Sequence, residues 1–177
     1  MNMEKLIEFI NPYYENKDIM HNMWHIELML KWVDKIISIG EYQSDYEALV
    51  LATYFHGFIY SNEKQIFEWL KLQKYNEDRI EKIISIAWES QRPEIPTSLE
   101  GKILHDAHVL EGGKNYLITK SLITGSVRGQ TLKETIKYIE ENILDCNHCY
   151  LTETIPLCKA MNDYSREFIE ELKIGIR

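Results

Sequence analysis

Residues that break or cross-link a chain are scarce in this sequence. Only eight glycines and four prolines occur among its 177 residues, which disfavours a turn-rich β-sandwich and favours a helical protein. Three cysteines do not make a disulfide framework, so we expect a protein of the reducing cytoplasm. No apolar run approaches the roughly 20 residues that a membrane-spanning helix needs, and the first residues lack the pattern of a secretory signal. The sequence therefore predicts a cytoplasmic protein without a membrane partner.

Positive charge is also in short supply. Lysine and arginine number 20 against 28 aspartates and glutamates, which gives a formal net charge of −8. A protein that neutralises the phosphates of duplex nucleic acid needs a basic face, so this balance argues against that class of partner. The balance describes the average surface only, and a local cationic pocket can exist inside an acidic protein.

Apolar residues are plentiful and recur with helical spacing. Hydrophobic residues make up 45% of the chain, and most recur at positions i, i+3, i+4 and i+7. The length suits one domain over residues 1–177. We predict an all-α bundle of about seven to nine helices.

The ends of the expected helices are marked by capping residues, glycines and prolines. Pro12 should stop the first helix, Gly40 should close the second, and Thr131 with Glu134 forms a capping-box pattern. A loop is expected at residues 91–97. The expected helices are 6–10, 21–39, 45–56, 62–72, 76–90, 98–110, 114–123, 131–144 and 151–173, with a loop at 125–129.

Three of the six histidines occur on helix faces that are otherwise apolar. They are His25, His56 and His108, and each belongs to a different expected helix. One such histidine is usually a buried neutral imidazole that donates a hydrogen bond to a carbonyl. Three of them on converging helices can point to one centre, and imidazole nitrogen is a common metal ligand.

The strings around these histidines resemble a known superfamily. They are HNMWHI at residues 21–26, LATYFH at 51–56 and DAHVLE at 106–111, followed by Lys120, Gly125, Gly129 and Thr131. In order and spacing they look like the HD-domain superfamily of metal-dependent phosphohydrolases, over roughly residues 13–145. The resemblance implies an HD-type helical bundle, a His…His-Asp…Asp metal site, and hydrolysis of a nucleotide or small phosphate ester. Members are often dimers, so it also implies a homodimer.

Within this resemblance two family carboxylates are missing. The first family histidine falls on His25, and the His-Asp doublet falls on His56 and Gly57. The last family aspartate falls on His108, whereas a register shift of two residues would make Asp106 the ligand instead. Residues i and i+2 lie about 200° apart on a helix, so only one of them can face the centre, and we favour His108.

Three imidazoles without a carboxylate define an unusual donor set. They leave a divalent ion nearly its full charge and favour Zn, Fe or Ni over Mg or Mn, with Mn still a candidate. The missing aspartate removes a bridging ligand, so we expect one metal rather than two. Gly57, if helical, costs about 1 kcal/mol relative to alanine.

Further residues can assist such a centre. We expect Glu111, three residues after His108, to orient that imidazole. His21 is a candidate to contact phosphate or to act as acid or base. Lys120 lies where family members often have an arginine, and with Arg128 it is a candidate to bind the anionic part of a substrate.

Three functions remain open at this stage. The chain is a working hydrolase, a catalytically degenerate domain that binds a ligand or regulates, or an interaction domain whose histidines only pack. Cys146 and Cys149 form a CxxC pair, but a zinc knuckle needs a fourth ligand and a thioredoxin-like motif needs a βαβ context. We interpret this pair as part of the loop between the last two helices.

Overall fold

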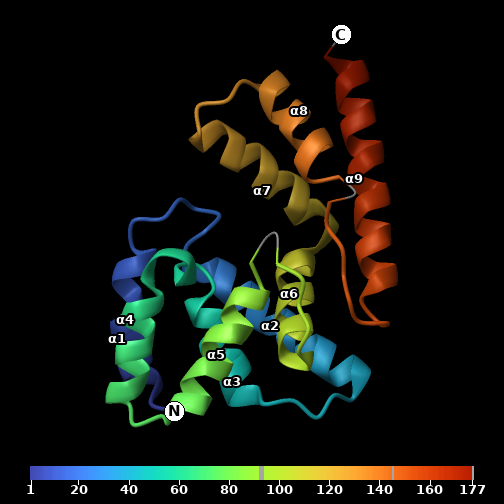
Figure 1. Ribbon diagram of the computed structural model, residues 1–177. Helices are drawn as coiled ribbons and strands as arrows, with labels where there is room; N and C mark the ends of the chain where they lie inside the picture. The colour runs from blue at the N-terminus through green and yellow to red at the C-terminus, as the bar shows by residue number, and fades with distance from the viewer. Residues whose placement is uncertain (92–93, 145, 177) are drawn as a thin grey trace.

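Nine helices and no strand make up the described residues, 1–91, 94–144 and 146–176, of the computed structural model (Figure 1). This confirms the all-α prediction; residues 92 and 93 of the expected loop lie outside the described part. No helix in that part is long and apolar enough to cross a membrane. The helices are α1 (Met3–Tyr14), α2 (Met23–Gly40), α3 (Tyr46–Phe55), α4 (Ile59–Leu72), α5 (Glu77–Glu89), α6 (Leu99–Leu110), α7 (Gly113–Val127), α8 (Leu132–Asn142) and α9 (Ile155–Gly175).

Most helix starts follow from side chains that accept the first backbone N–H groups. An α-helix leaves these groups without partners inside the helix, and Asn, Asp, Ser and Thr are the side chains that best accept them. The predicted capping box of Thr131 and Glu134 is present. The residues that cap a helix in this way are Asn2, Asn22, Asp45, Asn76, Ser98 and Thr131.

The helices form two packed groups. α1 to α6 enclose the larger hydrophobic core, in which α2 packs along α6 and α3 along α5. α7, α8 and α9 lie together at one end of the molecule, around a smaller core that includes Ile136, Ile139 and Ile169 (Figure 1). Val109 and Leu110 at the end of α6 contact Cys158 and Met161 of α9 and so join the two groups. This packing brings α2, α3 and α6 side by side.

One predicted break is absent because a glycine serves close packing instead, and a second glycine ends its helix as predicted. α7 continues through Gly125, where a Cβ atom would lie 2.2 Å from the Thr135 hydroxyl of α8. Gly40 is the last residue of α2, and its Cβ would lie 2.1 Å from the Tyr42 ring, whereas Glu41 adopts the left-handed conformation. Gly125 therefore marks a close contact rather than the break that we expected, whereas Gly40 marks both a close contact and the predicted helix end.

The first helix also differs from its prediction. α1 continues past Pro12 to Tyr14 rather than stopping before the proline. Proline removes one N–H donor from the helix, a loss that is smallest near a helix end. Tyr14 is buried, and its hydroxyl donates to the Tyr54 carbonyl at 2.8 Å, which stabilises this last turn.

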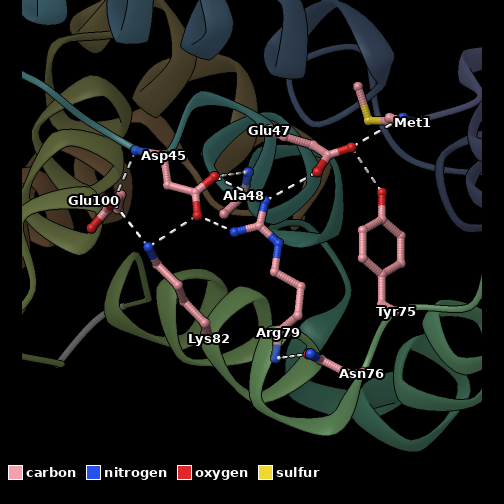
Figure 2. A network of polar contacts seen from close by, with 9 residues as sticks. All are labelled: Met1, Asp45, Glu47, Ala48, Tyr75, Asn76, Arg79, Lys82 and Glu100. Carbon is pink, nitrogen blue, oxygen red and sulfur yellow. Dashed lines mark hydrogen bonds and ion pairs between the residues drawn. The ribbon is translucent and has the colours of Figure 1, made fainter.

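A polar network fixes the chain start against α3, α5 and α6 (Figure 2). Its centre is the guanidinium of Arg79 on α5, which forms ion pairs with Asp45 and Glu47 at the start of α3. The Asp45 carboxylate also accepts the Ala48 N–H at 3.2 Å, so one side chain caps the helix and joins two elements. The other charged members are the Met1 amino group, Lys82 and Glu100.

Candidate metal centre

Three imidazoles from three elements converge between α2, α3 and α6. His25 lies in the first turn of α2, His56 directly follows α3, and His108 lies in the last turn of α6. Their candidate ligand atoms all lie within 4.8 Å of one another. Among the described residues they are the one group of three or more His, Cys, Asp or Glu side chains able to bind a metal ion. The predicted ligands are therefore brought together.

The His25 imidazole is oriented by a buried carboxylate. Its Nδ1 is hydrogen-bonded to Glu111 at the end of α6, and Glu111 in turn forms an ion pair with Lys120 of α7. We expected Glu111 to orient His108, whereas the structure pairs it with the histidine of a neighbouring helix. With the Nδ1 proton donated to Glu111, Nε2 is the nitrogen left to bind a metal. Burial lowers the pKa of His25 against the opposing effect of Glu111, which favours the neutral imidazole.

The end of α5 orients the His56 imidazole. Nδ1 of His56 lies 2.7 Å from the Ser90 hydroxyl, which donates to the Ala87 carbonyl at 2.6 Å. The hydroxyl oxygen can therefore accept the Nδ1 proton and leave Nε2 for a metal. Gln91 donates to the His56 carbonyl at 2.9 Å. Burial lowers the pKa of His56 well below its usual value, which keeps this ring neutral.

The Asp106 carboxylate has a different set of partners. It is fully buried and accepts the backbone N–H groups of Tyr150 and Leu151 at 2.9 to 3.0 Å, together with the Thr154 hydroxyl at 2.5 Å. Of the two residues that the sequence left in competition, the structure places His108 in the histidine cluster. Asp106 instead anchors the segment before α9.

A tyrosine fills the space beside Gly57. This glycine lies in the turn between α3 and α4, so the helical cost that we expected does not apply. A Cβ atom at residue 57 would lie 2.6 Å from the Tyr14 hydroxyl oxygen and 2.7 Å from its Cε1 atom. The Gly57 N–H donates to the same hydroxyl at 3.1 Å. The buried ring therefore leaves no room for a side chain at residue 57 unless Tyr14 moves.

Two cavities border the histidine cluster. The first, the histidine cavity, has a volume of about 300 Å³ and is lined by the three imidazoles with Lys17, His21, Gly57, Tyr60 and Gln91. The second, the α7 cavity, has a volume of about 160 Å³ and is lined among others by Tyr116, Lys120, Thr124, Arg128 and Tyr138. His21 and His108 line both cavities, so they border the same centre from two sides.

The remaining predicted residues occupy separate places. His21 lies beside the cluster, with Nδ1 2.8 Å from the Asp18 carboxylate, and the Arg128 side chain is exposed at the α7 cavity. Cys146 and Cys149 lie between α8 and α9, as expected, and both are free thiols. The sequence did not indicate Lys17, Ser90 or Gln91, because all three lie in or next to turns without a periodic pattern.

The fold has solved relatives. No family model matches the chain, and no curated protein matches it by sequence. The Lin1889 protein of Listeria innocua is 22% identical with a TM-score of 0.70, over 98% of this chain and 96% of that one. YpgQ of Bacillus subtilis, in a crystal structure of its complex with ADP, is 13% identical with a TM-score of 0.75, over 99% of this chain and 98% of that one. At these identities the comparison establishes a shared fold.

Proposed function

We propose that this chain is an HD-type phosphohydrolase that acts on a nucleotide or a small phosphate ester through a single metal ion. The observation that supports it best is the convergence of His25, His56 and His108 from three elements, with their ligand atoms within 4.8 Å of one another. Two of these imidazoles are buried, and each has a partner for Nδ1 that leaves Nε2 for the metal.

The donor set fits a borderline-soft divalent ion. Three neutral imidazoles suit Zn, Fe or Ni better than Mg, and Mn stays a weaker candidate. A bound ion of this kind lowers the pKa of water and polarises a phosphate oxygen. The chain supplies His25, His56 and His108 as its ligands, and burial keeps the first two in the neutral, binding form.

Other side chains of the site are suited to a phosphorylated organic substrate. His21 has Nδ1 engaged by Asp18, so its Nε2 is the atom available to exchange a proton with a phosphate oxygen or leaving group. Lys120 and Arg128 line the α7 cavity and place positive charge there. Tyr116 and Tyr138 line the same cavity and give it aromatic surface for a nucleobase. The ADP complex of YpgQ, which shares this fold, supports a nucleotide as the ligand.

Metal analysis of the purified chain tests this proposal. We expect about one Zn, Fe or Ni ion for each wild-type chain after loading, and far less in His56→Ala, measured by elemental analysis. Phosphate release from nucleotides and phosphomonoesters should then follow the metal content. Absence of any first-row metal from the loaded wild type would overturn the proposal.

A catalytically degenerate binding domain is the second candidate function. The observation that favours it is the Tyr14 ring, which fills the place of a carboxylate beside His56. Metal and ADP binding without phosphate release from any tested compound would select this candidate over the hydrolase.

A further inference from the structure

Lys17 brings an ammonium group to the histidine cavity from the turn between α1 and α2. Its Nζ donates to the Gly57 carbonyl, next to His56, and lies 5.5 Å from the centre of the Tyr14 ring. The side chain is half-buried and lines the cavity together with the three imidazoles. An ammonium has three N–H donors, and the Gly57 carbonyl takes only one of them.

The carboxylates around the histidine cluster form their hydrogen bonds and ion pairs with groups other than Lys17. Asp18, its neighbour in the chain, accepts the Met20 N–H at 2.8 Å and pairs with His21. Glu111 pairs with His25 and Lys120. Within residues 1–91, 94–144 and 146–176 no carboxylate forms an ion pair with Lys17. The cavity therefore combines the neutral imidazoles of His25 and His56 with an ammonium that Asp18 influences through space but does not pair with.

Burial of the Lys17 ammonium costs free energy unless a ligand in the cavity replaces the water that it has lost. Removal from water lowers the pKa of Lys17, because a half-buried ammonium loses part of its hydration. An anion in the cavity would restore that lost solvation through charge-assisted hydrogen bonds. The hydrogen bond to the Gly57 carbonyl does not by itself require a charged donor.

We propose that Lys17 forms an anion subsite in the histidine cavity, which binds the phosphoryl oxygens of a phosphate chain beside the histidine cluster. The subsite rests on the proposed function for its role, since it would bind the phosphates of a substrate whose organic part occupies the α7 cavity. Its ligand chemistry is that of a phosphate or pyrophosphate group, either free or as the end of a nucleotide.

Calorimetric titration of the metal-free full chain tests the subsite directly. The probes are inorganic phosphate, pyrophosphate and ADP, compared in the wild type, Lys17→Met and Lys17→Arg. We expect Lys17→Met to weaken pyrophosphate binding on the order of tenfold, because one charge-assisted contact is lost, and Lys17→Arg to retain most of it. Lys35→Met is the matched control, since Lys35 also covers an aromatic ring, that of Trp32 at 4.1 Å, but lies outside both cavities.

Zinc binding supplies a second measurement that separates a binding role from a structural one. Removing a positive charge near the cluster should leave zinc affinity unchanged or raise it. Loss of pyrophosphate binding together with loss of zinc stoichiometry in Lys17→Met would assign Lys17 to the stability of the turn and overturn the subsite. Equal pyrophosphate binding in the wild type and Lys17→Met, or none in either, would overturn it as well.

The subsite and the proposed function can fail separately. Lys17-dependent pyrophosphate binding by a chain that binds no first-row metal would support the subsite and end the hydrolase proposal. A zinc-loaded Lys17→Met variant that releases phosphate with wild-type kcat and KM would overturn the subsite and leave the hydrolase proposal intact. If ADP binding depends on Lys17 but binding of inorganic phosphate does not, the subsite binds the end of a nucleotide.

Discussion

The contact between Gly57 and Tyr14 shows how a single position depends on a residue 43 places away in the sequence. Tyr14 is buried at the end of α1, and its hydroxyl contacts both the Tyr54 carbonyl and the Gly57 N–H. Its ring leaves no room for a side chain at residue 57. The glycine at residue 57 is thus tied to the packing of another helix.

Replacing Gly57 with alanine should therefore destabilise the protein. The added Cβ would overlap the Tyr14 ring, and overpacking of this kind costs about 1–3 kcal/mol of unfolding free energy. The control is Gly175→Ala on α9, because no atom lies within 4 Å of a Cβ at that residue. Urea unfolding of both variants measures the difference. Wild-type stability of Gly57→Ala would show that the Tyr14 ring moves aside without cost.

The histidines could be predicted from the sequence, whereas their supporting residues could not. His25, His56 and His108 interrupt apolar helical faces. Helical periodicity depends only on residues close together in the chain, so this pattern can be recognised from the sequence alone. Lys17 and Gln91 lie at turns, where the direction of a side chain depends on packing between elements. Glu111 was identified, but its hydrogen bond to His25 was not predicted, because His25 lies on another helix.

At the scale of elements, Asp106 connects α6 to the segment that leads into α9. Its carboxylate accepts two backbone N–H groups and the Thr154 hydroxyl without exposure to solvent. We predict that Asp106→Asn lowers the unfolding free energy by about 1–3 kcal/mol, since an amide nitrogen cannot accept these bonds.

The same variant distinguishes an anchor from a metal ligand. Zinc stoichiometry should remain that of the wild type, measured by elemental analysis below the melting temperature. Loss of zinc at unchanged stability would make Asp106, and not His108, the third ligand.

Low pH should weaken the ion pair that links the start of α3 to α5. The Arg79 guanidinium holds the pKa of Asp45 well below its usual range, so the folded state binds fewer protons than the unfolded state near pH 4. Stability from this pair is therefore present above about pH 4 and lost as the pH falls below it. Asp45→Asn keeps a capping side chain, but its unfolding free energy should be about 1 kcal/mol lower than that of the wild type at pH 7. The difference should be smaller at pH 3.

Urea midpoints of the wild type and Asp45→Asn between pH 3 and 7 measure this difference. The exposed Glu167→Gln variant on α9 serves as the control and should follow the wild type. A gap between wild type and Asp45→Asn that does not change with pH would contradict the ion pair as its cause.

Helix starts and helix ends differed in how well the sequence predicted them. Starts at Asp45, Ser98 and Thr131 depend on side chains that act within one turn, so local sequence is sufficient. Gly40 and Gly125 were taken as ends because glycine often stops a helix. Gly40 does end α2, whereas Gly125 lies inside α7, where its contact with Thr135 joins two helices.

At the scale of the whole molecule, the two groups of helices differ in how many of their residues are buried. In α7 only Ile118 and Gly125 are buried, whereas every residue of α3 from Ala48 to Phe55 is. Local opening is easier where fewer apolar contacts are lost. The α7 cavity lies within this less buried group, next to the histidine cluster.

We predict that amide hydrogen exchange is faster in α7 and α8 than in α3, and that ADP slows it in α7. A ligand in the α7 cavity would contact residues of α6, α7 and α8 and so stabilise their closed state. Exchange measured by mass spectrometry with and without ADP tests this, with α3 as the internal control. Protection by ADP confined to α3 and α4 would contradict the assignment of the cavity.

The Tyr14 ring also constrains the evolutionary routes open to this chain. Acquiring an aspartate at residue 57 by one substitution meets the ring, whereas shrinking Tyr14 first leaves the Tyr54 carbonyl and the Gly57 N–H without their hydroxyl partner. Either first step lowers stability before the second can restore it. A side chain at residue 57 and the two hydrogen bonds of the Tyr14 hydroxyl therefore exclude each other, so this chain can gain the first only by giving up the second.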